Sequence, residues 1–268
     1  MITGRLIQGT KTRLEIYERG DGPRLIVMVH GYNSSARGWS LVQEALDPDK
    51  YSTIAINNRG AGESERPLDE TFYTVESFAE DLLDITATIG IEDFTLIGHS
   101  MGAATITRFA LDHPGIANGL ILLNSTPMLG RESPIGWEQD VKNKFRTGSF
   151  SLDFGPNKDN IPADFAQGLQ YDVARNPLAR ALAGRRSMDS LDLRDKMGDL
   201  NIPVLVIGGD LDDTVGVDNL LLDFLALPEK RRFLHMFHSV GHSPNFEVPH
   251  QLAVVIDVFA DRIYREPA

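Results

Sequence analysis

The chain has 268 residues, of which 42% are hydrophobic, and this suits one domain or one core domain with an insertion. Its formal net charge of -12 argues against the basic surface of a nucleic-acid-binding protein, so we expect no nucleic-acid partner. The absence of cysteine excludes disulfides, thiolate metal sites and a cysteine nucleophile.

The sequence carries no sign of a membrane segment. Residues 1–5 lack the apolar run of a signal peptide, and no stretch approaches the roughly 20 apolar residues of a membrane-spanning helix. We therefore expect a cytoplasmic protein with no membrane partner.

Short apolar or β-branched runs alternate along the chain with longer helical patterns. A strand that is buried on both faces requires a continuous apolar run. Such runs predict strands at 14–17, 25–29, 53–56, 94–97, 120–123, 204–207 and 233–237, and helices at 75–89, 100–111, 217–227 and 251–264. The alternation predicts an α/β fold with a mostly parallel central sheet and helices on both faces.

Residues 128–195 break this alternation. The stretch is polar, rich in Gly, Pro and Asp, and has no clear strand, although 164–169 and 178–193 are candidates for short helices. Its aromatic residues argue against a disordered loop. We predict a core formed by residues 1–127 and 196–268, with a helical cap insertion at 128–195.

Residues 94–102, Phe-Thr-Leu-Ile-Gly-His-Ser-Met-Gly, carry the most informative pattern in the chain. They place G-x-S-x-G between a predicted strand and a predicted helix. On so tight a turn the serine takes strained backbone geometry, and its hydroxyl projects above the carboxyl edge of the sheet. Ser100 is therefore the candidate nucleophile, with simple capping of the helix as the alternative.

This segment resembles the nucleophile elbow of the α/β-hydrolase superfamily, and the likeness extends over nearly the whole chain. The resemblance implies the α/β-hydrolase fold and a catalytic triad in the chain order Ser, Asp, His. The residues His-Gly-Tyr-Asn at 30–33 resemble the H-G-x loop of that superfamily. The matching backbone N–H groups of Tyr32 and Met101 would then form the oxyanion hole. His30 is expected to fix this loop, and His99 to be structural or to line the pocket.

The resemblance also implies a base and an acid. The family places its base on the loop after the last strand, before a helix start that resembles residues 247–249, and this position is His242. The acid follows the strand at 204–207, where residues 209–212 match a G-x-x-D pattern. The match favours Asp212, with Asp213 in reserve.

One turn departs from the family pattern. Residues 57–64, Asn-Asn-Arg-Gly-Ala-Gly-Glu-Ser, resemble the D-x-R-G-x-G-x-S turn, but Asn57 replaces the usual Asp. The turn is structural in most members of the family. The departure therefore puts a local salt bridge in question rather than catalysis.

The resemblance implies a serine hydrolase that cleaves a small acyl ester or lactone through an acyl-enzyme intermediate. Serine at position 100 argues against relatives that use an aspartate nucleophile. Two alternatives stay open: hydrolysis of a C–C, amide or carbamate bond by the same triad, or a ligand receptor with vestigial hydrolysis.

We expect a small-molecule acyl substrate as the partner, and a homodimer is possible. No cofactor and no metal are implied, because the glycine-rich turns do not form a dinucleotide-binding motif and the His and Asp residues offer no ligand set. Five aromatic residues of the insertion are candidates to line the substrate pocket: Trp137, Phe145, Phe150, Phe154 and Phe165.

Overall fold

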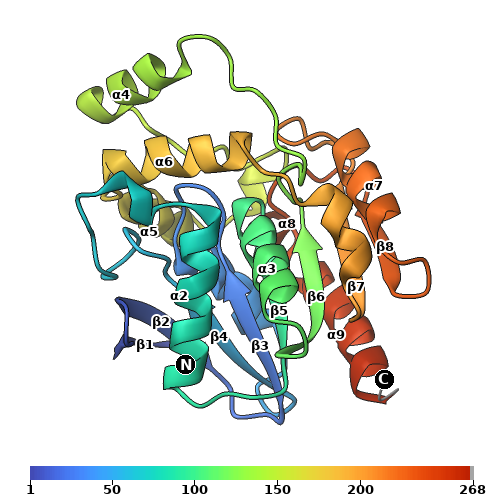
Figure 1. Ribbon diagram of the computed structural model, residues 1–268. Helices are drawn as coiled ribbons and strands as arrows, with labels where there is room; N and C mark the ends of the chain where they lie inside the picture. Colours follow the sequence, from blue (N-terminus) through green and yellow to red (C-terminus); the bar gives the residue numbers. More distant parts are fainter. Residues whose placement is uncertain (266–268) are drawn as a thin grey trace.

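The computed structural model describes residues 1–265. Its centre is an eight-stranded sheet in the order β1-β2-β4-β3-β5-β6-β7-β8 (Figure 1). β2 pairs antiparallel with β1 and β4, and every other neighbouring pair is parallel. The strands are β1 (Thr3–Gln8), β2 (Arg13–Arg19), β3 (Arg24–Val29), β4 (Tyr51–Ile56), β5 (Phe94–His99), β6 (Ala117–Leu123), β7 (Val204–Gly209) and β8 (Arg232–Phe237). The predicted α/β fold with a mostly parallel sheet is confirmed.

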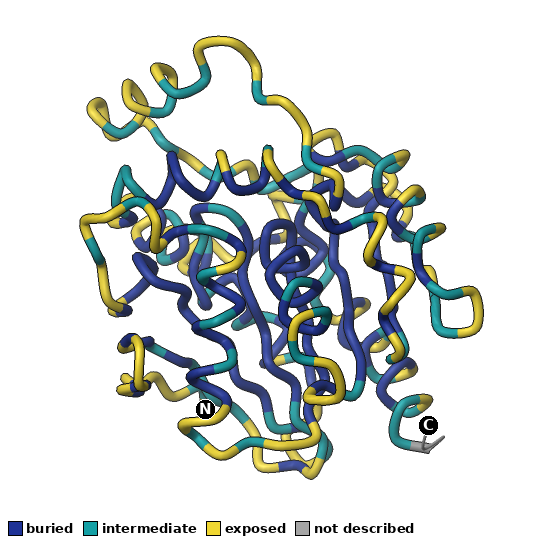
Figure 2. The backbone as a smooth tube through the Cα atoms, viewed as in Figure 1, coloured by how far each residue is buried: buried dark blue, intermediate teal, exposed yellow. Residues whose placement is uncertain are grey.

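The central strands are apolar at successive residues because each face of the sheet supports its own core. In β3, Val27 and Val29 pack into the core beneath α2 (Val75–Thr88) and α3 (Met101–Asp112). Ile26 and Met28 point to the opposite face, into the core that α1 (Ser40–Ala45) and α9 (Pro249–Arg265) cover. Figure 2 shows the result as a buried sheet between two helical layers. This two-sided burial fixes the strand ends that carry the candidate site.

The predicted strands and helices all form, with shifts of a few residues at their ends. β1 is the strand that the sequence did not predict, and it lies at the edge of the sheet with Ile7 as its one buried residue. The remaining helices outside the insertion are α7 (Val217–Ala226) and α8 (Pro244–Glu247). Within the described residues, no helix has both the length and the apolar character needed to cross a bilayer.

The chain between β6 and β7, which we call the β6–β7 excursion, forms helices and, over its described length, no strand. Its α-helices are α4 (Trp137–Thr147), α5 (Ala163–Ala174) and α6 (Leu178–Asp189). Figure 1 shows α6 across the end of the sheet toward which β6 points, and α4 farther out. The expected helix at 178–193 ends at Asp189, and a 3-10 turn follows at Arg194–Asp199. The excursion closes at its base, where the Leu193 N–H donates to the Met128 carbonyl oxygen over 2.8 Å.

The turn after β4 keeps an ion pair although it begins with Asn57. The Arg59 guanidinium pairs with the carboxylate of Asp81, and both side chains are buried. Asn57 uses both ends of its amide: Nδ2 donates to Glu15 Oε2 at 2.8 Å, and Oδ1 accepts from the Ala36 N–H at 2.7 Å. The asparagine thus supplies a donor that an ionised aspartate lacks.

Candidate active site

Ser100 occupies the turn between β5 and α3 with φ 53° and ψ -118°, a backbone conformation that is costly for a residue with a side chain. The glycines on either side permit the turn. A Cβ at Gly98 would lie 2.3 Å from the Gly102 carbonyl oxygen, and a Cβ at Gly102 would lie 2.3 Å from the Val29 carbonyl oxygen. The G-x-S-x-G pattern is therefore required by close packing of the strand, the helix and the neighbouring strand.

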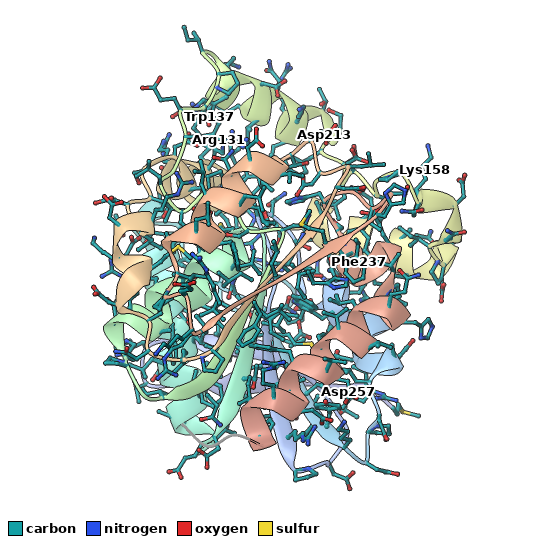
Figure 3. All side chains as sticks on the ribbon, turned by 90° about the vertical axis from the view of Figure 1, so that its right-hand side faces the viewer. Arg131, Trp137, Lys158, Asp213, Phe237 and Asp257 are labelled. Atoms are coloured by element: carbon teal, nitrogen blue, oxygen red, sulfur yellow. The ribbon has the colours of Figure 1, made fainter. Side chains whose placement is uncertain are left out.

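The acid and the base predicted from the sequence meet in the structure. His242 follows β8, and its Nδ1 lies 2.9 Å from Asp212 Oδ2, beyond the end of β7. Asp212 is buried, and its Oδ1 accepts the backbone N–H groups of Thr214 and Val215 at 2.9 and 3.2 Å. Asp213 is exposed, and Figure 3 shows it at the upper end of the molecule. The geometry thus brings Asp212, rather than Asp213, to the imidazole.

Asn124 completes the surroundings of Asp212, and sequence reasoning missed it. It lies just beyond β6 with φ 41°, and its Nδ2 donates to Asp212 Oδ2 at 2.7 Å and to the Gly241 carbonyl oxygen at 3.2 Å. Burial raises the pKa of the Asp212 carboxyl, but the hydrogen bonds from His242 and Asn124 outweigh it, so the pKa lies below its usual value. Asp212 is therefore ionised at neutral pH.

A second carboxylate, Glu247, holds the backbone on both sides of His242. Its Oε2 accepts the Gly241 N–H and its Oε1 accepts the Ser243 N–H, each at 3.0 Å. Glu247 is buried, and Asn157 Nδ2 also donates to it at 3.1 Å. The sequence pattern named Glu247 as part of a helix start, but its partners became visible only in the folded loop.

Two buried histidines are neutral and support the loops of the site. Burial lowers the pKa of His99 to about 3, so its Nε2–H donates to the His242 carbonyl oxygen at 2.8 Å. Burial likewise lowers the pKa of His30 to about 3. The Asn58 N–H donates to His30 Nε2 at 3.2 Å, which leaves Nδ1–H to donate to the Gly31 carbonyl oxygen at 2.9 Å. Both histidines thus have the structural roles expected of them.

The backbone N–H groups of Tyr32 and Met101, the two expected oxyanion-hole donors, have no hydrogen-bond acceptor within residues 1–265. Tyr32 lines the same cavity as Ser100, and a Cβ at Gly31 would lie only 3.1 Å from Ser100 Cβ. The loop therefore approaches the elbow as closely as glycine permits, which suits a pair of oxyanion-hole donors.

A cavity of about 270 Å³ connects these groups. Ser100 and His242 both line it, although no direct hydrogen bond joins their side chains in the described chain. Such hydrogen bonds often tighten only when substrate binds. The β6–β7 excursion contributes much of the opposite wall, through Arg131, Phe150, Leu152, Asp153, Arg185, Met188 and Asp189. Figure 3 places Arg131 near the top of the molecule, close to the start of α4.

Of the five aromatic residues expected to line the pocket, only Phe150 does so. Phe154 and Phe165 pack against Phe246, with ring centroids 5.7 and 5.8 Å apart, and so attach the excursion to α8. Phe145 packs edge-on against Phe150 at 5.3 Å. Trp137 begins α4, a helix with no buried residue (Figure 3). Phe145, Phe154 and Phe165 therefore pack against other aromatic rings and do not line the cavity beside Ser100.

Comparison with known proteins identifies the family of the chain. A family model described as the alpha/beta hydrolase fold matches residues 24–249. The chain is 28% identical over 217 residues to a 2-(acetamidomethylene)succinate hydrolase of Mesorhizobium japonicum, covering 74% of each chain. It is 26% identical over 256 residues to a putative 2-succinyl-6-hydroxy-2,4-cyclohexadiene-1-carboxylate synthase of Bacillus subtilis, covering 89% of this chain and 90% of the relative.

A solved structure of a thermophilic esterase from Thermogutta terrifontis has the same fold. The two superpose with a TM-score of 0.80 at 20% identity, covering 97% of this chain and 99% of the esterase. The matched family model spans most of the sheet and all the loops described above. The chain therefore belongs to the α/β-hydrolase family, as an enzyme of the hydrolase class.

Proposed function

We propose that the chain cleaves a small acyl ester or lactone through an acyl-enzyme intermediate, with Ser100 as nucleophile, His242 as base and Asp212 as the acid that orients it. The observation that carries the proposal is the contact of 2.9 Å between His242 Nδ1 and Asp212 Oδ2. A proton held on Nδ1 leaves Nε2 unprotonated, and only that nitrogen can then accept the serine proton.

The proposed reaction has two halves, acylation and deacylation, and both use the same groups of the site. His242 removes the Ser100 proton as the hydroxyl attacks the acyl carbon, and then returns it to the leaving group. The N–H groups of Tyr32 and Met101 stabilise the oxyanion, and loss of one such donor costs about 3 kcal/mol of barrier. Water activated by the same histidine then releases the acid from Ser100.

We propose that residues 128–195 act as a cap on a core of residues 1–127 and 196–268. The cap side chains complete the wall of a cavity of about 270 Å³, near the lower end of the range for ligand pockets. A cap over a site of this size limits the access of water and so strengthens the oxyanion contacts. It supports a compact small-molecule substrate.

The relatives support two bond types. The structural similarity to an esterase agrees with ester cleavage. The second candidate is amide hydrolysis on the same triad, because the Mesorhizobium japonicum hydrolase is named for a substrate that carries an acetamido group. The putative synthase from Bacillus subtilis is named for a reaction outside hydrolysis, and a panel of bond types separates these candidates.

The test is a substrate panel of phenyl esters, lactones, amides and carbamates, with Ser100→Ala and Ser190→Ala as paired variants. We expect sustained turnover of at least one ester or lactone, its loss in Ser100→Ala, and normal activity in Ser190→Ala, which removes an exposed hydroxyl. A fluorophosphonate should modify Ser100 alone. Full activity in Ser100→Ala, or labelling at another residue, would refute the proposed nucleophile.

A further inference from the structure

Arg180, on α6, is buried without any partner for its charge. Its exposed fraction is 1%, and it is among the largest fully buried side chains. Nε, Nη1 and Nη2 of its guanidinium all lack a hydrogen-bond acceptor within residues 1–265. Buried arginines are normally paired, because an isolated charge in the interior loses its hydration without compensation.

No hydrogen bond joins the Arg180 guanidinium to a carboxylate within residues 1–265. The ionisable groups with the largest effect on its pKa are Tyr32, Tyr73 and Arg66, and the last of these is a second cation. Burial lowers the pKa of Arg180 to about 10, so the guanidinium stays protonated at neutral pH. The contrast is Arg59, which is also buried but pairs with the carboxylate of Asp81.

The guanidinium lies between α6, the turn at 57–64 and the loop at 30–33. A Cβ at Gly60 would lie 2.6 Å from Arg180 Cδ, which places the arginine stem against the turn. The positive charge of Arg180 also contributes to the low pKa of His30, so the charge acts on the loop as well. Asn58, in the same turn, has a buried Nδ2 that lacks an acceptor. The guanidinium of Arg180 and the amide of Asn58 thus present buried donor groups that no acceptor within residues 1–265 receives.

We propose that Arg180 binds a small monovalent anion of the halide class, such as chloride, in the interior between α6 and these two loops. An anion balances the buried charge, whereas neutral water only hydrates it. The ligand must be small, because Arg180 is fully buried and does not line the cavity beside Ser100. The site is therefore separate from the position where substrate would bind.

The position links the anion to the candidate site through α6. The Tyr32 hydroxyl donates to the Ala181 carbonyl oxygen at 2.8 Å, one residue beyond Arg180. An anion that neutralises Arg180 would stabilise α6 at this contact and hence the packing of the loop that carries Tyr32. The primary effect is on stability, so the test does not depend on the proposed reaction.

The first test is diffraction from crystals of the whole chain soaked in sodium bromide. We expect an anomalous peak in contact with the Arg180 guanidinium, and no such peak in Arg180→Met crystals. Ordered water at the guanidinium, with no anomalous signal at high bromide, would overturn the proposal. This measurement on the unaltered protein decides the question even if Arg180→Met fails to fold.

The second test follows thermal unfolding in sodium chloride and, at matched ionic strength, in sodium gluconate, whose anion is too large for the interior. Chloride at ten to a hundred times its Kd should raise the Tm by about 3–5 °C, and the shift should grow with the logarithm of the chloride concentration. Arg180→Met should lose this difference between the salts. Arg186→Met, on the same helix but with an exposed side chain paired to Glu138, should keep it. An equal chloride effect in Arg180→Met would overturn the assignment to Arg180.

Discussion

At the scale of single residues, two buried carboxylates determine the position of His242. Asp212 holds its imidazole through Nδ1, and Glu247 holds the backbone N–H groups on either side of it. The ring and its loop are thus fixed by separate groups. Substitutions that act on the ring alone can therefore be distinguished from those that act on the loop.

Asp212→Asn should lower kcat about ten-thousandfold, whereas Asp213→Asn should leave it near the normal value. The amide cannot stabilise the imidazolium and favours the wrong tautomer of His242. Asp213 is exposed, and no hydrogen bond or ion pair joins it to His242 within residues 1–265, so it provides the matched control. Steady-state kinetics on the best substrate measures both, and a reversed order of severity would assign the acid to Asp213.

Asn124→Ala should lower kcat about tenfold to a hundredfold with little change in KM. The substitution removes a hydrogen bond to an ionised carboxylate, a contact that contributes about 1.5–3 kcal/mol, and also frees the Gly241 carbonyl oxygen. Asn143→Ala, on the exposed helix α4, serves as the control. A KM effect of the same size, with kcat unchanged, would mean that Asn124 contacts substrate instead.

The predicted triad residues are recognisable from sequence because each lies in a local pattern: an elbow, or a loop after an apolar strand. Asn124 also follows an apolar strand, and Glu247 belongs to a recognisable helix start, but neither pattern indicates the hydrogen bonds that these residues make. Their roles depend on partners 88 residues away in the first case and on the curl of a short loop in the second. Hydrogen bonds between distant strand ends can be predicted only once the order of the strands in the sheet is known.

At the scale of elements, continuous apolar runs predicted the inner strands because these strands are buried on both faces. The same reasoning fails at the edge. β1 buries only Ile7 and so carries no apolar run. Helix α4 was missed because it buries no residue. Aromatic residues in the excursion indicated packing correctly, but their partners, such as Phe246, could not be chosen without the fold.

The cap that we propose should restrict acyl length. Phenyl esters compared from acetate to palmitate should give the highest kcat/KM at the short end, because the cavity of about 270 Å³ is closed partly by Phe150 and Leu152. Phe150→Ala should shift the optimum toward longer chains. Highest activity on palmitate, with a jump in rate when substrate forms an oil–water interface, would mean that the helices open as a lipase lid.

At the scale of the whole molecule, His30 and His99 should make the fold sensitive to acid. Burial lowers the pKa of each to about 3 in the folded protein, whereas a histidine in the unfolded chain has a pKa near 6.5. The unfolded chain therefore binds more protons than the folded protein once the pH falls below about 6.5. Stability is therefore lost as pH falls from about 6.5 toward 3. From about pH 7 to pH 5, each histidine lowers the free energy of unfolding by roughly 2 kcal/mol.

Urea unfolding at several pH values measures this loss. His99→Gln should lower the mean slope of the unfolding free energy against pH by about 1 kcal/mol per unit in that range, even if the variant is less stable at neutral pH. His250→Gln, at an exposed position in the first turn of α9, is the control substitution. An unchanged slope in His99→Gln would show that His99 gains its proton without unfolding.

The closure between Met128 and Leu193 has an evolutionary consequence. The hydrogen bond between their backbones brings the two ends of the excursion together at adjoining strands, so the sheet can keep its register whatever lies between them. Lengthening or replacing such a loop costs little chain entropy, because closure entropy grows only with the logarithm of length. Recombination at these two positions would exchange the whole proposed cap as one unit, while the proposed triad, which lies outside it, is inherited intact.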